Sequence, residues 1–278
     1  MKTHRFSPLA RAIACAVAAL LAGFATASEK KTEPAPAATG HAAHEKHWAY
    51  ETTDETAGPE AWGAVPGAAT CAAGKSQSPV ALESKSATAR DLPNLAFAYG
   101  AVPLRATNNG HTVQFEAAGA GTVTADGVAY TLAQYHFHAP SEHTLDGRRT
   151  PMEMHLVHLD AAGKAALVVG VFLAEGAENA ALAAAFRALP RAAGESLAPS
   201  GERIDPSLLL PKDRTYFAYS GSLTTPPCTE GLKWYVLRTP ATLSAAQVAA
   251  YLSLPHLAHS NRPVQPLGGR KVLLDTTP

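Results

Sequence analysis

The chain has 278 residues, of which 23 are Lys or Arg and 23 are Asp or Glu, so its formal net charge is zero. This balance argues against nucleic acid or an anionic membrane surface as a partner. The length suits one large domain, and no internal linker divides the sequence.

The first 27 residues have the pattern of a secretory signal peptide. A basic start precedes an apolar run over residues 12–25, and the small residues 25–27 close it. The run is shorter than the roughly 18 residues that a membrane span needs, so we expect no membrane insertion after cleavage. The predicted location is the periplasm. Cys15, inside the apolar run, leaves a lipoprotein cleavage site as the alternative.

Residues 28–46 are rich in Ala, Lys, Glu, Pro and Thr and have no hydrophobic period. Such a segment cannot bury enough surface to offset its ordering entropy, so we predict a disordered tether. His41, His44 and His47 fall there at intervals of three, which leaves loose metal binding open beside the simpler interpretation of a solvated polar tail. The folded domain is expected over residues 47–278.

Short apolar-alternating runs follow, punctuated by Gly, Pro, Asn and Asp, and this pattern predicts β-strands. The expected strands cover residues 113–115, 127–132, 152–159, 165–174, 215–219 and 232–238. Turn residues at 124–127 and 160–163 predict tight connections, and therefore antiparallel pairing.

Two helices are expected among these strands. One covers residues 178–189, with Leu182 and Phe186 on one face, and the other covers residues 244–252. Ser244 has the spacing from Gln247 of a capping box. The fold class is therefore mainly β (α+β), a single domain with a few peripheral helices.

Three histidines on two of the predicted strands form a candidate metal site. His136 and His138 are two residues apart in a β-patterned stretch, so their side chains point to the same side of the sheet. If this stretch pairs with the strand that carries His155, three imidazoles meet and a fourth tetrahedral position stays open, as in catalytic zinc sites. Zinc is the expected metal, although affinity alone would also admit copper, cobalt or iron.

A hydrogen-bond acceptor stands two residues before a proposed ligand on each strand. Gln134 precedes His136, and Glu153 precedes His155, each on the same face as its histidine. A metal-bound imidazole usually donates its other N–H to such an acceptor. One histidine alone would more simply be a hydrogen-bonded core residue, but three with matched acceptors favour a metal site. Neutral ligands leave the ion its full charge, so bound water would lose a proton near neutral pH.

Two cysteines remain once the predicted signal peptide is removed, Cys71 and Cys228. In an oxidising compartment the economical interpretation is one disulfide, and two free buried thiols are the alternative.

Several segments resemble the α-carbonic anhydrase family, in its bacterial periplasmic branch. The matching segments include residues 134–138 (QYHFH), 141–143 (SEH), 153–158 (EMHLVH) and 222–228 (SLTTPPC). The resemblance extends from Trp48 to Lys271. It implies a large, mostly antiparallel, twisted central sheet, a Zn²⁺ cofactor at the base of a cleft, and reversible hydration of CO₂ to bicarbonate and a proton. Only residues 139–140 separate two of the segments, which resembles the bacterial branch and leaves the cleft shape there open.

The resemblance also implies roles for individual residues. Thr224 would accept a hydrogen bond from zinc-bound hydroxide while donating to Glu142, which orients the attack. His111 would be the proton shuttle. His138 would donate to a main-chain carbonyl near Asn261. The resemblance implies a CO₂ pocket formed by Val157, Val168, Leu223, Thr224, Thr225, Leu232 and Trp234. It implies a water network at Tyr50, Asn109 and Gln114. It also implies that Cys71 and Cys228 are paired.

Without the family, these residues have simpler interpretations: Thr224 as a turn residue, Glu142 as a loop acid, His111 as an exposed turn histidine, and the pocket as core. Two other functions remain open, a zinc hydrolase acting on esters and a zinc-binding module without activity. The expected partner is the small-molecule substrate, with no nucleic acid, and the sequence leaves a homodimer open.

Overall fold

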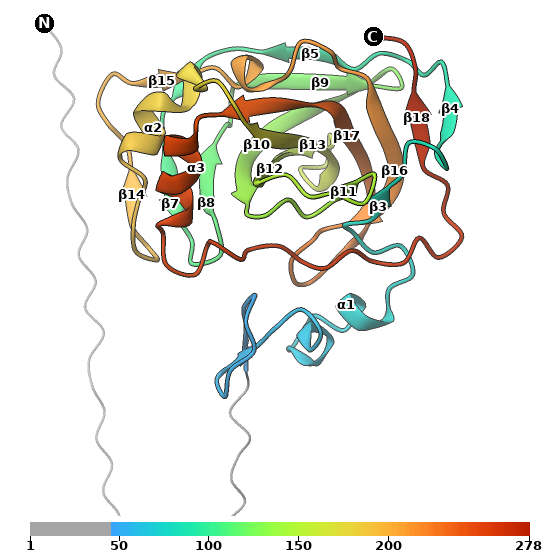
Figure 1. Cartoon of the computed structure of the whole chain (residues 1–278), viewed down its shortest axis with the longest axis horizontal. Coiled ribbons are helices and arrows are strands. Elements are labelled where there is room, and N and C mark those ends of the chain that lie inside the picture. Colours follow the sequence, from blue (N-terminus) through green and yellow to red (C-terminus); the bar gives the residue numbers. More distant parts are fainter. Residues whose placement is uncertain (1–45) are drawn as a thin grey trace, which may run out of the picture. The chain divides into compact units, whose positions relative to one another are not determined.

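The computed structural model describes residues 46–278 (Figure 1). The predicted signal peptide and the tether up to residue 45 lie outside the described residues, as do Cys15, His41 and His44. The residues that are described all belong to one compact unit. No helix within residues 46–278 is long and apolar enough to cross a membrane.

A 12-stranded sheet forms the body of the fold. Its strands follow one another in the order β14 (Ser196–Leu197), β7 (Ala106–Asn108), β8 (Val113–Glu116), β10 (Val128–His138), β12 (Met152–Leu159), β13 (Ala165–Glu175), β17 (Glu230–Leu243), β16 (Tyr216–Ser222), β18 (Leu273–Asp275) and β4 (Thr88–Arg90). Two more strands branch from β10, namely β9 (Gly121–Ala125) and β5 (Ala96–Tyr99).

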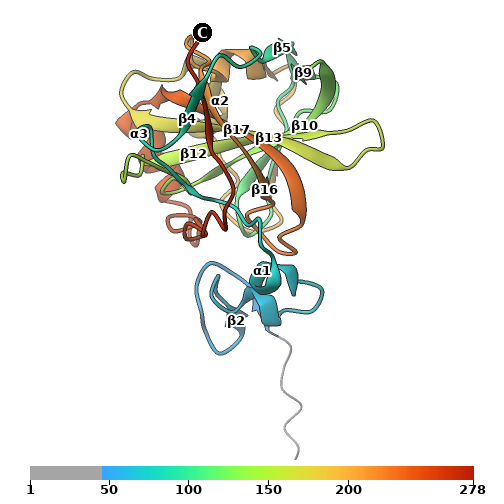
Figure 2. The same cartoon turned by 90° about the vertical axis from the view of Figure 1, so that its right-hand side faces the viewer.

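The β13–β17 and β18–β4 pairs are parallel, and the other pairs in this sheet are antiparallel. Figure 2 shows the twist of the sheet from the side. The expected fold class, with a large, mostly antiparallel twisted sheet, is confirmed.

Short elements surround the sheet. Three two-stranded pairs join β1 (His47–Trp48) to β2 (Thr56–Ala57), β11 (Thr144–Leu145) to β3 (Ala81–Leu82), and β15 (Arg203–Ile204) to β6 (Val102–Pro103). The short helices are η1 (Trp62–Ala64), α1 (Thr70–Ala73), η2 (Ala180–Leu182), α2 (Ala183–Arg187), η3 (Pro206–Leu209) and α3 (Ala245–Leu252). In Figure 1, α2 and α3 lie together near β7, β8 and β14.

All six predicted strands are present. β12 has the expected bounds, while residues 127–132 prove to be the first part of a longer strand, β10, that runs on to His138. Asp126 and Gly127 connect β9 to β10 with φ of 51° and 75°. Positive φ at both central residues is the geometry of a type I′ hairpin turn, which favours Asp-Gly.

Of the two predicted helices, one has nearly the expected bounds and the other is shorter than predicted. α3 begins after Ser244, which forms the expected capping box with Gln247. The helix predicted over residues 178–189 is shorter, because only η2 and α2 form. Pro190 disfavours helical backbone at the residue before it, and no side chain caps the start of either piece.

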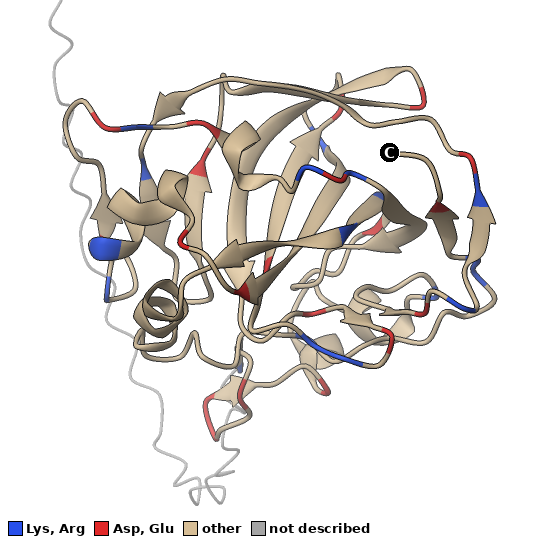
Figure 3. Cartoon of the chain, turned by 45° about the horizontal axis from the view of Figure 1, so that its top comes forward, with Lys and Arg blue, Asp and Glu red and all other residues tan. Residues whose placement is uncertain are grey.

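β12 is buried on both faces, and this position determines the surroundings of the candidate site. Met154 and Leu156 pack into the larger apolar core, whereas Val157 packs into a second cluster with Val168 and Trp234. By parity, Glu153 and His155 face the second cluster. Charged residues of both signs are scattered along the described part of the chain (Figure 3). A carboxylate inside the sheet is therefore an exception that needs compensating partners.

Candidate metal centre

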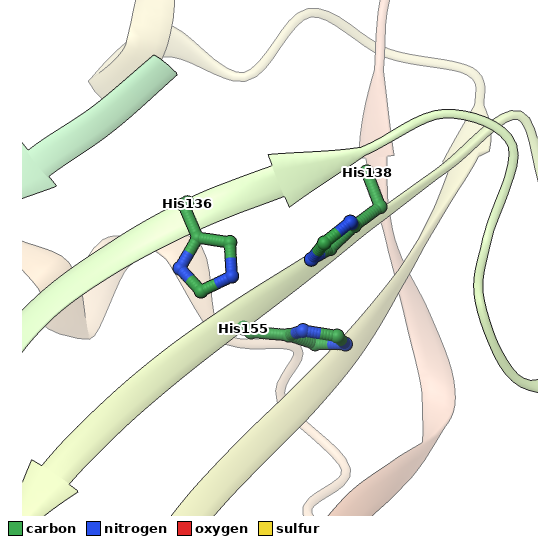
Figure 4. A group of neighbouring side chains, drawn as sticks. All are labelled: His136, His138 and His155. Carbon is green, nitrogen blue, oxygen red and sulfur yellow. The ribbon is translucent and has the colours of Figure 1, made fainter. Parts of the chain in front are cut away.

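Strand register brings the three predicted histidines together. β10 and β12 are antiparallel neighbours, and His136 lies directly opposite His155. A β-bulge shifts the register between Leu132 and Gln134, before the histidines, so that parity holds from Gln134 onward. One ligand atom of each histidine, including that of His138, lies within 4.8 Å of the other two, and the rings converge on one point (Figure 4). The strand pairing on which the metal-site hypothesis depended is present.

Each ring donates a hydrogen bond to a fixed acceptor. His136 Nδ1 lies 2.8 Å from Gln134 Oε1, and His155 Nε2 lies 2.8 Å from Glu153 Oε1. The acceptor left open for His138 is the main-chain carbonyl of Ser260, which lies 2.7 Å from its Nδ1 and directly precedes Asn261. Because all three partners can only accept, these ring nitrogens donate, and the other nitrogen of each ring is left for a metal ion.

The residues present fit a zinc ion. His138 Nε2 is buried and has no hydrogen-bond partner, and such an atom is costly unless something coordinates it. Burial lowers the pKa of His138 to about 4 and holds the pKa of His136 well below its usual range. The rings are therefore neutral at physiological pH, which is the form that binds a metal ion. Three imidazoles with one open position match catalytic zinc.

A second group of potential ligands, His143, Glu153 and His155, is explained by hydrogen bonds alone. Glu153 Oε1 accepts from His143 Nδ1 at 2.7 Å and from His155 Nε2 at 2.8 Å, while Oε2 accepts from the main-chain N–H of His143 at 2.9 Å. Burial by itself would raise the pKa of Glu153, but the two imidazoles outweigh it and hold that pKa well below its usual range. The carboxylate stays ionised and orients His155.

Glycine on the neighbouring strand makes room for this carboxylate. Gly170 of β13 is paired with His155. A Cβ at this position would lie 3.1 Å from Glu153 Oε1. This oxygen accepts both imidazole hydrogen bonds, and the side chain of any other residue at position 170 would be in steric conflict with it.

The sequence reasoning missed the partners of His143. Its Nε2 lies 2.7 Å from the hydroxyl of Tyr219, which in turn lies 2.9 Å from Ser78 Oγ. His143 appeared in a matching segment but received no role. The signal that would have found it is the need of buried Glu153 for more donors than one histidine supplies.

Glu142 is fully buried, in a loop beside the histidines. Its Oε1 accepts the main-chain N–H of Arg262 at 2.7 Å, and its Oε2 has no hydrogen-bond partner. Burial raises the pKa of Glu142 to about 7, against the opposing effects of His155, the Thr224 hydroxyl and the Arg262 N–H. The structure thus places Glu142 beside a metal ligand, with its Oε2 3.9 Å from His155 Nδ1.

A cavity of about 120 Å³ lies beside the ligands. The residues that line it include both histidines of β10 together with the predicted shuttle and the predicted water network. The lining comprises Trp48, Tyr50, Asn109, His111, Thr112, Gln114, Gln134, His136, His138 and Thr225.

The apolar residues of the predicted CO₂ pocket also lie together. Val157, Val168, Leu232 and Trp234 share one buried apolar cluster, and Leu223 packs against it. The Trp234 ring packs edge-on against His155, with ring centroids 4.9 Å apart. An apolar wall therefore adjoins the metal ligands.

His111 lies at the cavity, but its environment differs from the one expected for a histidine that titrates near neutral pH. Its ring stacks on Trp48 with centroids 3.6 Å apart, and His47 lies beyond at 5.9 Å. Burial, and then the charges of His47 and His256, lower the pKa of His111 to about 4. In this position the ring is neutral at pH 7 and holds protons weakly.

The predicted disulfide joins Cys71 of α1 to Cys228. Cys228 is fully buried in a cluster with Trp62 and directly follows the loop that carries Thr224. The interpretation as a single disulfide is confirmed over that of two free thiols.

Comparisons with known proteins agree with this arrangement. Residues 57–276 match the family model described as eukaryotic-type carbonic anhydrase. The carbonic anhydrase of Klebsiella pneumoniae is 44% identical over 230 residues, covering 82% of this chain and 90% of the relative. That of Neisseria gonorrhoeae is 40% identical over 238 residues, covering 85% and 90%. The α-carbonic anhydrase of Thermovibrio ammonificans, solved with the inhibitor sulfanilamide, superposes with a TM-score of 0.76 at 41% identity, covering 82% of this chain and 99% of that one.

Proposed function

Because the chain belongs to the eukaryotic-type carbonic anhydrase family, we propose that it hydrates CO₂ reversibly with a zinc ion held by His136, His138 and His155. The observation that carries this proposal is the set of three neutral imidazoles, each with its own acceptor, converging beside a cavity. A bound zinc ion would acidify water and so supply a hydroxide nucleophile at neutral pH.

Thr224 and Glu142 direct the attack. The main-chain N–H of Arg262 fixes one oxygen of Glu142, and the other oxygen has no partner and remains available to the hydroxyl of Thr224. With its hydrogen directed at Glu142 in a hydrogen bond, the Thr224 oxygen can only accept, so it would orient a hydroxide with a lone pair toward the carbon of CO₂. Fixing this geometry in advance lowers the entropic part of the barrier.

Val157, Val168 and Trp234 hold CO₂ beside the metal by apolar contact alone. They offer an uncharged, weakly polar molecule no competing hydrogen bonds, and their burial excludes bulk water from that side. Tyr50 and Gln114 line the cavity beside the ligands, through which the proton would leave by way of water to His111, a weak acceptor at its lowered pKa of about 4.

We place the enzyme in the periplasm, with residues 1–27 as its cleaved signal peptide. The disulfide between Cys71 and Cys228 supports an oxidising compartment. Detection of mature protein beginning at residue 28 in a periplasmic extract tests this, and a chain that keeps its first residues in the cytoplasm refutes it.

Stopped-flow measurement of CO₂ hydration tests the function, with zinc-free protein as the control. We expect activity that disappears on removal of zinc and returns when zinc is added. Activity that is absent, or indifferent to the metal, would favour a binding role instead. A higher specificity constant for an activated ester than for CO₂ would make the protein a hydrolase.

A further inference from the structure

One short segment of the chain contacts two different parts of the site. Ser260 accepts the Nδ1–H of His138 with its carbonyl oxygen at 2.7 Å. Two residues later, the main-chain N–H of Arg262 donates to Glu142 Oε1 at 2.7 Å. Residues 260–262 thus orient a metal ligand and the carboxylate partner of Thr224 at once.

This segment is not part of the sheet, because residues 260–267 form neither helix nor strand. Its main chain is bound to the neighbouring loop where Ser260 N–H donates to the carbonyl of Ala139 at 2.8 Å. Farther along, the N–H of Gln265 donates to the Pro79 carbonyl at 2.7 Å, so a side chain must hold the residues between these two main-chain bonds.

The side chain of Arg262 supplies that hold. It is 1% exposed, and its guanidinium donates to Gln77 Oε1 and to the Ser78 carbonyl at 2.8 Å, and to the Cys71 carbonyl at 3.0 Å. Its carbon also lies 5.5 Å from the centre of the Trp62 ring. These three bonds come from Nη1 and Nη2, while Nε is buried without a partner, and together they fix the position of the guanidinium closely.

We propose that Arg262 is a positioning residue that aligns His138 and Glu142 together, through the main chain of residues 260–262. This inference rests on the proposed function. The guanidinium touches neither a metal ligand nor the CO₂ pocket. Its effect passes through two main-chain hydrogen bonds, so losing the anchor disturbs metal retention and turnover together.

The test uses Arg262→Met in the full-length, zinc-loaded protein. Methionine keeps much of the volume but has no donor, so residues 260–262 lose their anchor while the apolar pocket is untouched. We expect zinc to pass to a chelator about tenfold faster, as for other changes to groups that orient metal ligands. We also expect kcat for CO₂ to fall by a similar factor with KM unchanged.

Gln247→Leu is the matched control. Gln247 is 5% exposed and also makes three hydrogen bonds to main chain, two with Asn179 and one with Ser244, but none with the site. Its loss lowers thermal stability and leaves zinc release unchanged. If the two variants release zinc at the same rate, Arg262 is merely structural and the proposal is overturned.

Arg262→Lys covers the case in which Arg262→Met does not fold. Lysine keeps the charge but reaches fewer of the three acceptors, so zinc release should fall between wild type and Arg262→Met. Zinc release as slow as that of wild type would overturn the proposal. A wild-type protein that holds zinc but does not hydrate CO₂ would refute the proposed function, and zinc release would still report on the anchor.

Discussion

The site has a half built from strands and a half built from loops, and the two halves are held in different ways. His136, His138 and His155 lie on β10 and β12, where register fixes the position of each ring. Glu142 and Thr224 lie on loops, and side chains and main-chain groups from distant segments hold them. The strand half should therefore decide whether metal is bound, and Glu142 and Thr224 how well the bound metal is used. Residues 260–262 contact both halves, so changes there affect both properties.

The largest effect is expected from His138→Ala in the strand half. The change removes a ligand whose Nε2 has no protein partner, so the metal site loses a third of its donors, and the bond from Nδ1 to the Ser260 carbonyl is lost with it. Zinc content should fall from about one ion per chain to near zero, and CO₂ hydration to the uncatalysed rate. Atomic absorption measures the zinc content, and stopped-flow kinetics measure the hydration rate. A variant that keeps its zinc would contradict the claim that the strand half decides metal binding.

Cys228→Ser acts on the loop half, and it should lower stability and activity together. Without the bond to Cys71 the unfolded chain gains freedom, and the expected loss is about 3 kcal/mol in the free energy of unfolding. The loop that carries Thr224 also loses its tether. Thermal unfolding and turnover, each with and without reductant, measure this. An unchanged melting temperature and unchanged turnover on reduction would show that the loop keeps its conformation without the disulfide.

Thr224→Ala tests the separation of metal binding from metal use. The change removes the hydroxyl that aims the nucleophile and leaves all three histidines in place. We expect kcat/KM for CO₂ to fall about 100-fold, as for a loss of reactant alignment, with zinc content unchanged. Loss of zinc in this variant would mean that the two halves are not separable.

The smallest effect concerns His111 and its contact with Trp48. Burial is the main reason that the pKa of His111 is lowered to about 4, so Trp48→Ala should raise it toward the ordinary value near 6.5. Because the folded protein binds fewer protons than the unfolded chain, stability falls as the pH drops from about 6.5 to 4, and Trp48→Ala removes part of that fall. Imidazole titration by NMR measures the pKa.

A companion variant asks whether His111 carries protons at all. His111→Ala should slow CO₂ hydration in weak buffer by a few-fold, and added imidazole should restore the rate by replacing the missing base. Failure of imidazole to restore it would point to a different relay.

The sequence predicted the strand half well, because a period of two fixes the side on which each residue lies. Gln134 and Glu153 could be assigned as acceptors from parity, without any knowledge of the fold. The same logic could not show the β-bulge after Leu132, which depends on how the partner strand aligns. The bulge lies before the histidines, so His136 and His138 still share one face of the sheet.

The loop half was accessible only through resemblance, and in part not at all. A main-chain carbonyl such as that of Ser260 belongs to every residue type, so no sequence pattern marks it as the acceptor for His138. The anchoring side chain of Arg262 binds segments that are distant in sequence, with no period to reveal it. The lowered pKa of His111 likewise depends on a tryptophan far earlier in the chain.

Gly170 extends the site to a third strand. It bears no side chain, yet it leaves the gap into which the Glu153 carboxylate fits. A mutational scan that scored only thermal stability would rank an added methyl group here as a minor packing change. Scored for metal retention instead, the same methyl would crowd the carboxylate oxygen that accepts from His155, so the site includes a residue that contributes by having no side chain.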